Sequence, residues 1–142
     1  MHWSIQIISC ALAAFFVALL LNQPRKTMLL SGLIAGLGYA IFMLLGQSTL
    51  GYFFATLFIG TACEICARLM KKISTLFITS ALIPLVPGVG LYRTMRYLVQ
   101  GEYSLAVSCG TETLMGICAI ALGITISSVL FANIRKRERK EA

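Results

Sequence analysis

Long apolar runs, broken once by a cluster of prolines and glycines, constrain the fold of this chain more than any other feature. The break reads Ile83-Pro84-Leu85-Val86-Pro87-Gly88-Val89-Gly90. An α-helix cannot continue through it, because each proline lacks a backbone N–H and clashes with the preceding turn. Only a bilayer would solvate the flanking stretches, and unwound backbone at membrane depth is tolerated only where protein or a water-filled cavity satisfies its polar groups. The pattern predicts a discontinuous membrane helix, which is typical of transport proteins.

The composition agrees with a membrane setting. Hydrophobic residues make up 58% of the 142 residues and charged residues 12%, with a mean hydropathy of +0.88, whereas soluble domains carry roughly 25% charged residues. The net charge of +7 is spread in short basic clusters between apolar runs, a pattern that encodes membrane topology rather than nucleic-acid binding. We therefore expect membrane lipid around the chain, no nucleic-acid partner, and no room for a soluble catalytic domain.

Hydropathy predicts an all-α polytopic membrane protein with five transmembrane helices, the fourth broken at the Pro-Leu-Val-Pro-Gly segment. Each run is long enough for the roughly 20 residues that cross about 30 Å of hydrocarbon. The chain forms a single membrane domain, 1–142, whose expected spans cover residues 3–22, 27–46, 52–70, 73–100 and 105–131, followed by a basic cytoplasmic tail at 132–142.

The basic clusters predict the orientation. Arg25-Lys26, Lys71-Lys72 and the basic tail all lie on the cytoplasmic side only if the number of crossings is odd, which places the N-terminus outside and the C-terminus in the cytoplasm. No basic residue precedes the first apolar run and no small-residue cleavage site follows it, so we expect a permanent span and not a cleaved signal peptide.

Small residues in the second span indicate close helix packing. Gly32 and Gly36 form a Gly-x-x-x-Gly pair, which lets two backbones approach closely, either within this chain or against another subunit.

The five cysteines all lie in apolar runs, and only Cys63 and Cys66 have a ligand-like spacing. With a single distant histidine, His2, they complete no tetrahedral zinc site, so we expect neither metal nor cofactor. The chain has no aspartate and no G-x-S-x-G motif, which argues against a hydrolase.

Charged residues inside apolar runs are the first functional candidates, because the membrane makes them expensive. Glu64 and Arg68 are four residues apart on one helix face, so they form either a neutralised structural pair or a site with a proton-responsive carboxylate. Glu112 in the last run is either interfacial or a pathway carboxylate that partners Arg93 or Arg96. Both glutamates are thus candidates for proton coupling.

Arg93 and Arg96 follow the break and predict a substrate-binding site. They are three residues apart, beside Tyr92, so one helical turn presents both guanidinium groups to nearly the same side, and a guanidinium binds a carboxylate through two parallel hydrogen bonds. The N–H groups of the half-helix that begins at Pro87-Gly88 would add partial positive charge, so the expected site also includes Pro87, Gly88 and Gly90. The alternative is that both arginines lie beyond the outer interface and simply end the span.

The same residues give the chain a resemblance to the threonine/serine exporter family, and in particular to its small five-helix subunit. The matching segments are Gly32-Leu33-Ile34-Ala35-Gly36, Phe54-Ala55-Thr56-Leu57-Phe58-Ile59-Gly60, Ala67-Arg68, Leu76-Phe77-Ile78, Ala81-Leu82-Ile83-Pro84-Leu85-Val86-Pro87-Gly88 and Tyr92-Arg93-x-Met95. The resemblance covers nearly the whole chain, and the Pro-Leu-Val-Pro-Gly segment is its most specific element.

The resemblance implies a secondary exporter in a bacterial inner membrane, coupled to the proton gradient, for threonine and serine or for succinate-like dicarboxylates. It implies a partner, a large subunit with a cytoplasmic N-terminal region and its own five helices. The two halves would be inverted repeats in the membrane, and a higher oligomer is compatible with the pattern.

Two other classes of function stay open from the sequence. A membrane scaffold or assembly subunit would use the same helices without a substrate of its own. A membrane-embedded enzyme is the weaker alternative, since only Glu112 with Ser108, Thr111 and Thr113 could supply a positioned base. We therefore expect no enzymatic activity.

Overall fold

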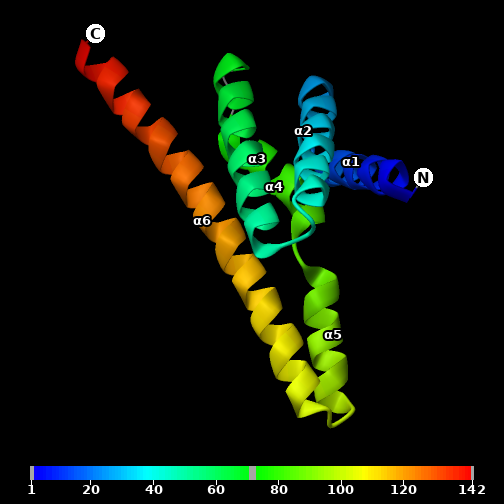
Figure 1. The fold of residues 1–142 in the computed structure, drawn as a ribbon. Helices are drawn as coiled ribbons and strands as arrows, with labels where there is room; N and C mark the ends of the chain where they lie inside the picture. Colours follow the sequence, from blue (N-terminus) through cyan, green and yellow to red (C-terminus); the bar gives the residue numbers. More distant parts are fainter. Residues whose placement is uncertain (1, 71–72, 142) are drawn as a thin grey trace.

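A computed structural model describes residues 2–70 and 73–141, with side chains described over 4–25, 27–70 and 73–132. Every element in this part of the chain is helical. In chain order they are α1 (His2–Leu20), α2 (Arg25–Leu44), α3 (Thr49–Leu69), α4 (Ser74–Leu82), the 3-10 turn η1 (Ile83–Leu85), α5 (Gly88–Val99) and α6 (Tyr103–Glu141) (Figure 1). Lys71 and Lys72, and the side chains of His2, Lys26 and the basic tail, lie outside the described residues.

Helices α1 and α2 form an antiparallel pair that packs through glycine. A Cβ atom at Gly32 would lie 3.1 Å from the Ala11 carbonyl oxygen, and one at Gly36 would lie 3.3 Å from the Ala11 Cβ. The Gly-x-x-x-Gly face predicted from the sequence is therefore used inside this chain. The turn that follows α2 has two residues with positive φ, Gly46 and Gln47, and Ser48 then caps α3 by accepting a hydrogen bond from the Gly51 N–H at 3.3 Å.

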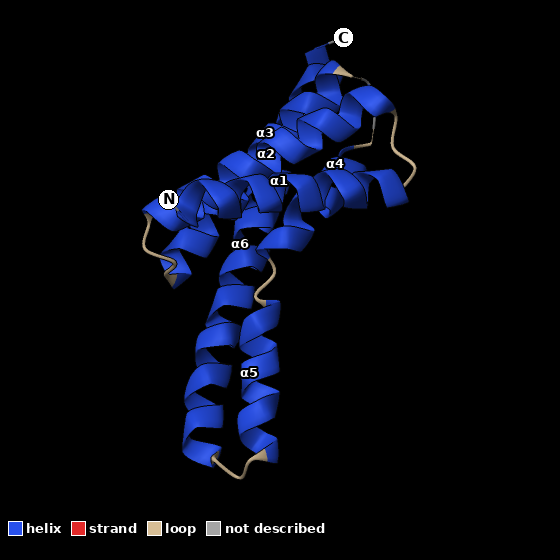
Figure 2. Ribbon diagram, turned by 90° about the vertical axis from the view of Figure 1, so that its right-hand side faces the viewer, coloured by secondary structure: helices blue, strands red, loops and turns tan. Residues whose placement is uncertain are grey.

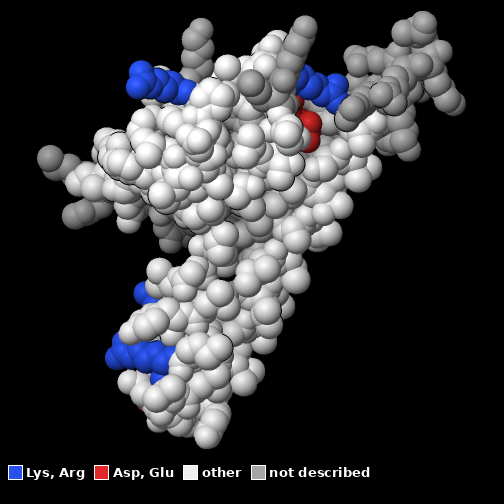
Figure 3. Space-filling view, turned by 180° about the vertical axis from the view of Figure 1, so that it is seen from behind, with Lys and Arg blue, Asp and Glu red and all other residues white. Residues whose placement is uncertain are grey.

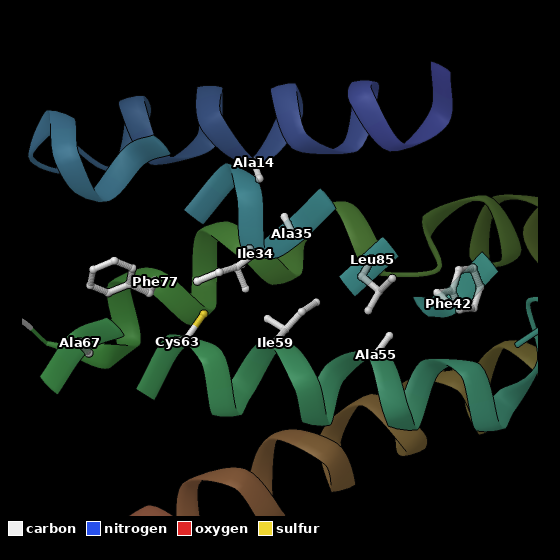
Figure 4. Packing of buried hydrophobic residues seen from close by; sticks show 11 residues of the cluster. Ala14, Ile34, Ala35, Phe42, Ala55, Ile59, Cys63, Ala67, Phe77 and Leu85 are labelled. Carbon is white, nitrogen blue, oxygen red and sulfur yellow. The ribbon is translucent and has the colours of Figure 1, made fainter. Parts of the chain in front are cut away.

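The hydrophobic core lies between α1, α2, α3 and α4. Figure 4 shows its side chains pointing toward one another, with alanines where the backbones are closest and larger groups filling the space between them. The buried cluster consists of Ala14, Ile34, Ala35, Phe42, Ala55, Ile59, Cys63, Ala67, Phe77, Ala81 and Leu85. Neither α5 nor α6 contributes to it, so these two helices depend on other contacts.

Helix α6 packs in parallel along α3 through reciprocal glycine contacts. The Ser127 side chain lies on Gly60, and the Thr56 hydroxyl lies on Gly123, so that any Cβ at either glycine would collide with it. Both hydroxyls donate to carbonyls of their own helices: Thr56 to Tyr52 at 2.8 Å and Ser127 to Ile124 at 2.9 Å. Because they need no partner across the interface, they pack simply as small side chains.

Helix α5 and the part of α6 that faces it, residues 103–116, form an arm that projects from the rest of the molecule (Figures 1 and 2). In the described part of the chain, α6 is the helix that packs along α5, and no residue of α5 is fully buried. We call the remainder, α1 to α4 with the upper part of α6, the body. The broken membrane helix thus has one half in the core, α4, and one half in the arm, α5.

Within the described residues, three helices are long and apolar enough to cross a membrane, at Thr27–Leu44, Thr49–Leu69 and Tyr103–Ala132, and four if the bent pair α4–α5 counts as one span. The bend in that pair is 47°, which agrees with the predicted break. Helix α1 is apolar but shorter, with 17 described residues from Ser4 to Leu20. The fold is therefore that of an all-α polytopic membrane protein, while the fifth span stays a prediction. The expected tail continues α6 as helix.

Candidate functional site

The break between α4 and α5 is confined to two residues, Val86 and Pro87. Pro87 has φ −75° and ψ 59°, and the Gly88 N–H bonds the Val86 carbonyl at 2.7 Å, which is the geometry of an inverse γ-turn. Upstream, the Val86 N–H bonds the Ile83 carbonyl at 3.3 Å and closes the 3-10 turn that contains Pro84. The prolines therefore redirect the chain sharply, with little extended backbone.

The two glycines after the break have different roles. Gly90 lies directly against the Thr113 side chain of α6, and the Cys109 thiol contacts its carbonyl at 3.7 Å. Gly88 has nothing within 4 Å of the position that a Cβ would take. One turn further along the arm, Thr94 packs on Gly110 in the same way. Gly90 therefore permits close α5–α6 packing. From the sequence alone, it was interpreted as part of the unwound break.

Arg93 and Arg96 are both exposed on α5, on one flank of its contact with α6, and Tyr92 is exposed nearby. In Figure 3 the basic side chains of the arm gather along one edge. Glu112 is exposed on α6. Since Gly90 lies opposite Thr113 and Thr94 opposite Gly110, Arg93 and Glu112 sit within about 2 Å of the same level along the arm. No ion pair joins them among the described residues.

Glu64 and Arg68 do not form the expected ion pair in the described part of the chain. Arg68 instead donates from Nη2 to the Phe131 carbonyl oxygen of α6 at 2.6 Å, and its guanidinium lies 4.9 Å from the centroid of the Phe131 ring. This contact fixes the end of α3 to α6. Glu64 is half-buried one turn earlier on α3, with no hydrogen bond or ion pair to a described residue. Among the described residues, it is therefore a carboxylate without a partner inside a candidate span.

Comparison with family models gives one match, described as "Threonine/Serine exporter, ThrE", which covers residues 6–130. The chain belongs to the threonine/serine exporter family. The match includes every predicted site residue and both halves of the broken helix. Comparison with curated proteins gives no match, and comparison with solved structures gives none either. As a member of an exporter family with several apolar helices, the chain is a multi-pass membrane protein of transporter type.

This exporter-family chain also has a buried polar cluster that the sequence interpretation missed. Gln23, in the turn between α1 and α2, is 4% exposed, and its Nε2 donates to the Leu76 carbonyl at 2.6 Å and contacts the Ser80 hydroxyl at 3.3 Å. The Ser31 hydroxyl lies 3.4 Å from Gln23 Oε1. The cluster therefore attaches α4 to the α1–α2 pair. A glutamine before Pro24 looks like an ordinary loop residue in the sequence, so no signal there identifies it.

The predicted site residues of the exporter-family chain thus fall into two groups. Pro87, Gly88, Gly90, Tyr92, Arg93, Arg96 and Glu112 lie together on the arm, whereas Glu64 lies in the α3–α6 contact of the body. All five cysteines are free, and no group of three or more histidine, cysteine or acidic side chains that could hold a metal ion occurs in the described residues.

Proposed function

We propose that this chain is the small half of a two-component secondary exporter that moves small carboxylate-bearing metabolites, threonine and serine or succinate-like dicarboxylates, out of the cytoplasm of a bacterium. Membership of the exporter family supports transport. The main structural support for the proposed binding site is the broken helix. Its second half, α5, presents two exposed arginines, and α6 is the described helix that packs along it.

The chemistry of the arm suits a carboxylate. Arg93 or Arg96 would bind it through two parallel N–H···O bonds, which a flexible lysine could not reproduce. The turn at Val86–Pro87 directs α5 out of the core, and the contact of Gly90 with Thr113 holds it on α6. In this proposal Pro87 and Gly88 set the start of α5, and Tyr92 precedes Arg93 on the same helix.

The partner in this proposal is a large membrane subunit with five helices of its own and a cytoplasmic N-terminal region. The small chain would sit in the inner membrane with its N-terminus outside and its C-terminus in the cytoplasm, inverted relative to the large half. An arm with only one supporting helix supports this view, because it leaves surface for a second half to cover.

The experiment is counterflow of labelled threonine, serine and succinate into proteoliposomes that contain this chain, the large subunit, or both. We expect flux only with both chains, and its loss in Arg93→Ala or Arg96→Ala although the complex still forms. Two results would refute the proposal that the two chains form a carrier: flux with the large subunit alone, or no flux in any pairing although the complex is intact. The second result would favour a scaffold subunit.

Proton coupling is tested at the two carboxylates. If Glu112 carries the proton, Glu112→Gln should flatten the dependence of efflux on pH while Glu64→Gln keeps it, and the reverse holds if Glu64 is the carrier. Efflux is measured against external pH at fixed substrate gradient. A pH profile unchanged in both variants would remove both residues from coupling.

A further inference from the structure

The arm has two unlike sides. On α5, Gly90 and Thr94 face α6, and on α6, Gly110 and Thr113 face α5. With 100° between successive helical residues, these contacts determine on which side of the arm every other residue lies. In an antiparallel pair of right-handed helices, positions just before the contact residues fall on one side of the pair, and positions just after them fall on the other.

One side carries the polar groups. We call it the polar face, and its exposed polar residues are Arg93, Arg96, Gln100, Ser108 and Glu112. Val89 and Leu105 are the apolar side chains on this side. Gly116 lies on the same side, and the Tyr52 ring of α3 packs on it, so the body covers the polar face at its upper end.

The opposite side carries mainly large apolar groups, and the hydroxyl of Thr111, the exposed polar residue at its edge, donates to the Ser108 carbonyl of its own helix at 2.9 Å. We call it the apolar face, and its members are Leu91, Met95, Leu98, Val107 and Leu114, each at least 42% exposed. Glycine, alanine and serine, the residues that line contacts between membrane helices, are missing from this list. The apolar face therefore suits lipid chains.

The polar face lies within the apolar part of α6. The apolar part of α6 runs for 30 residues, Tyr103–Ala132, or about 45 Å, against about 30 Å of hydrocarbon. Glu112 is about 14 Å along this helix from Tyr103, and Arg93 lies level with it. A charged side chain that faces lipid along such a span is costly, which favours protein or water on this side.

Charge balance selects the occupant. The polar face has two guanidinium groups and one carboxylate, an excess of positive charge. A second copy of this chain would bring the same excess to the interface. A partner surface with at least one more carboxylate than it has basic groups would neutralise it.

We propose that the polar face of the arm is the surface that the second half of the exporter covers, through a membrane-embedded surface with at least one carboxylate, while the apolar face stays in lipid. The inference rests on the two-component function proposed above and adds to it the docking side. The route of the solute then runs between the polar face and the partner, with Ser108 and Gln100 along it beside the arginines.

The test uses two adjacent exposed residues on opposite sides of the arm. Ser108 and Val107 are each replaced by the photoreactive residue benzoylphenylalanine in the full chain, which is co-expressed with the large subunit and irradiated in membranes. We expect a covalent adduct with the large subunit from position 108 and only lipid adducts from position 107. Gln100 and Leu98 provide a second pair, in case one replacement prevents folding, which gel filtration in detergent reports.

Three results would overturn the docking side: an adduct between two copies of this chain from position 108, lipid adducts from both sides, or a large-subunit adduct from position 107 alone. Charge is tested separately. Each single variant keeps one guanidinium and should still form the complex, whereas the double variant Arg93→Ala/Arg96→Ala should weaken association of the two chains at least about tenfold. Unchanged association in the double variant would contradict the charge argument.

The adducts are scored without any transport measurement, so the two proposals can fail separately. Adducts from position 108 without flux in counterflow would contradict the proposed carrier function and support the proposed docking side. Flux that needs both chains, without adducts from positions 108 and 100, would support the carrier function and contradict the docking side.

Discussion

At the scale of single residues, the contacts of α6 follow one rule: a glycine on one helix faces a hydroxyl residue on the next. Gly60 faces Ser127, Thr56 faces Gly123, and the two pairs on the arm repeat the arrangement. Each hydroxyl bonds a carbonyl of its own helix, so the interface gains close packing without a buried unsatisfied group. At these four contacts shape sets the position of α6, and the Arg68 bond to the Phe131 carbonyl adds a polar contact at the end of α3.

Gly90→Ala should destabilise the arm, because its Cβ would overlap the Thr113 side chain. We expect a loss of about 1–3 kcal/mol in unfolding free energy, reduced by the better helix propensity of alanine. Unfolding in detergent monitored by circular dichroism measures it. Gly88→Ala, in open space two residues away, is the matched control and should leave stability unchanged or slightly raised. Adding Thr113→Ala should restore most of the loss, and equal stability of both glycine variants would contradict the packing argument.

Arg68→Ala should loosen the end of α3 from α6. It removes the Nη2 bond to the Phe131 carbonyl and the contact with the ring, which together are worth about 2 kcal/mol. The control is Arg25→Ala, since Arg25 is exposed at the start of α2 without a hydrogen bond or ion pair to described residues. Thermal unfolding in detergent should separate the two variants, and identical midpoints would show that the Arg68 contact does not contribute.

At the scale of elements, hydropathy and proline predict where helices begin, end and break, but not what they pack against. The break was visible in the sequence because Pro84 and Pro87 act locally, on the backbone next to them. The partner of Arg68 and the burial of Gln23 were not, since both depend on segments more than fifty residues away in the chain. Likewise, Glu112 lies level with Arg93 because Gly90 of α5 packs on Thr113 and Gly110 of α6 packs on Thr94. That register depends on two helices together and cannot be read from either one.

Gln23→Leu should weaken the attachment of α4 to the α1–α2 pair. The leucine cannot donate to the Leu76 carbonyl, and it leaves the Ser31 hydroxyl without its acceptor in a buried site, at a cost of about 1–3 kcal/mol. Proteolysis of the detergent-solubilised chain should then cut more readily between α4 and α5. Gln6→Leu, at an exposed position on α1, is the control. Equal cutting rates for the two variants would show that the Gln23 cluster does not hold α4.

At the scale of the whole molecule, the helix directions alternate along the chain from α2 to α6 (Figure 1). Helix α1 runs against α2, and α3 runs parallel to α6, so one descending passage through α4 and α5 must separate them (Figure 1). The start of α2, the end of α3 and the end of α6 lie at one end of the molecule, and the tip of the arm lies at the other. The sequence places its basic clusters at those first three positions, so one orientation satisfies the charge rule for all of them.

This arrangement predicts which residues face which side of the membrane. A cysteine that replaces Glu102, in the turn between α5 and α6, should react with a membrane-impermeant maleimide added to intact cells, because the tip of the arm faces outward in the proposed orientation. Arg25→Cys, at the opposite end of the molecule, should react only after the membrane is opened. The unsubstituted chain measures labelling of the five native cysteines.

If both positions reacted from outside, the number of crossings between α2 and α6 would be wrong, and with it the inverted pairing of the two halves. If only Arg25→Cys reacted from outside, the crossings would stand but the orientation would be reversed, and the arginines of the arm would face the cytoplasmic entrance of the route.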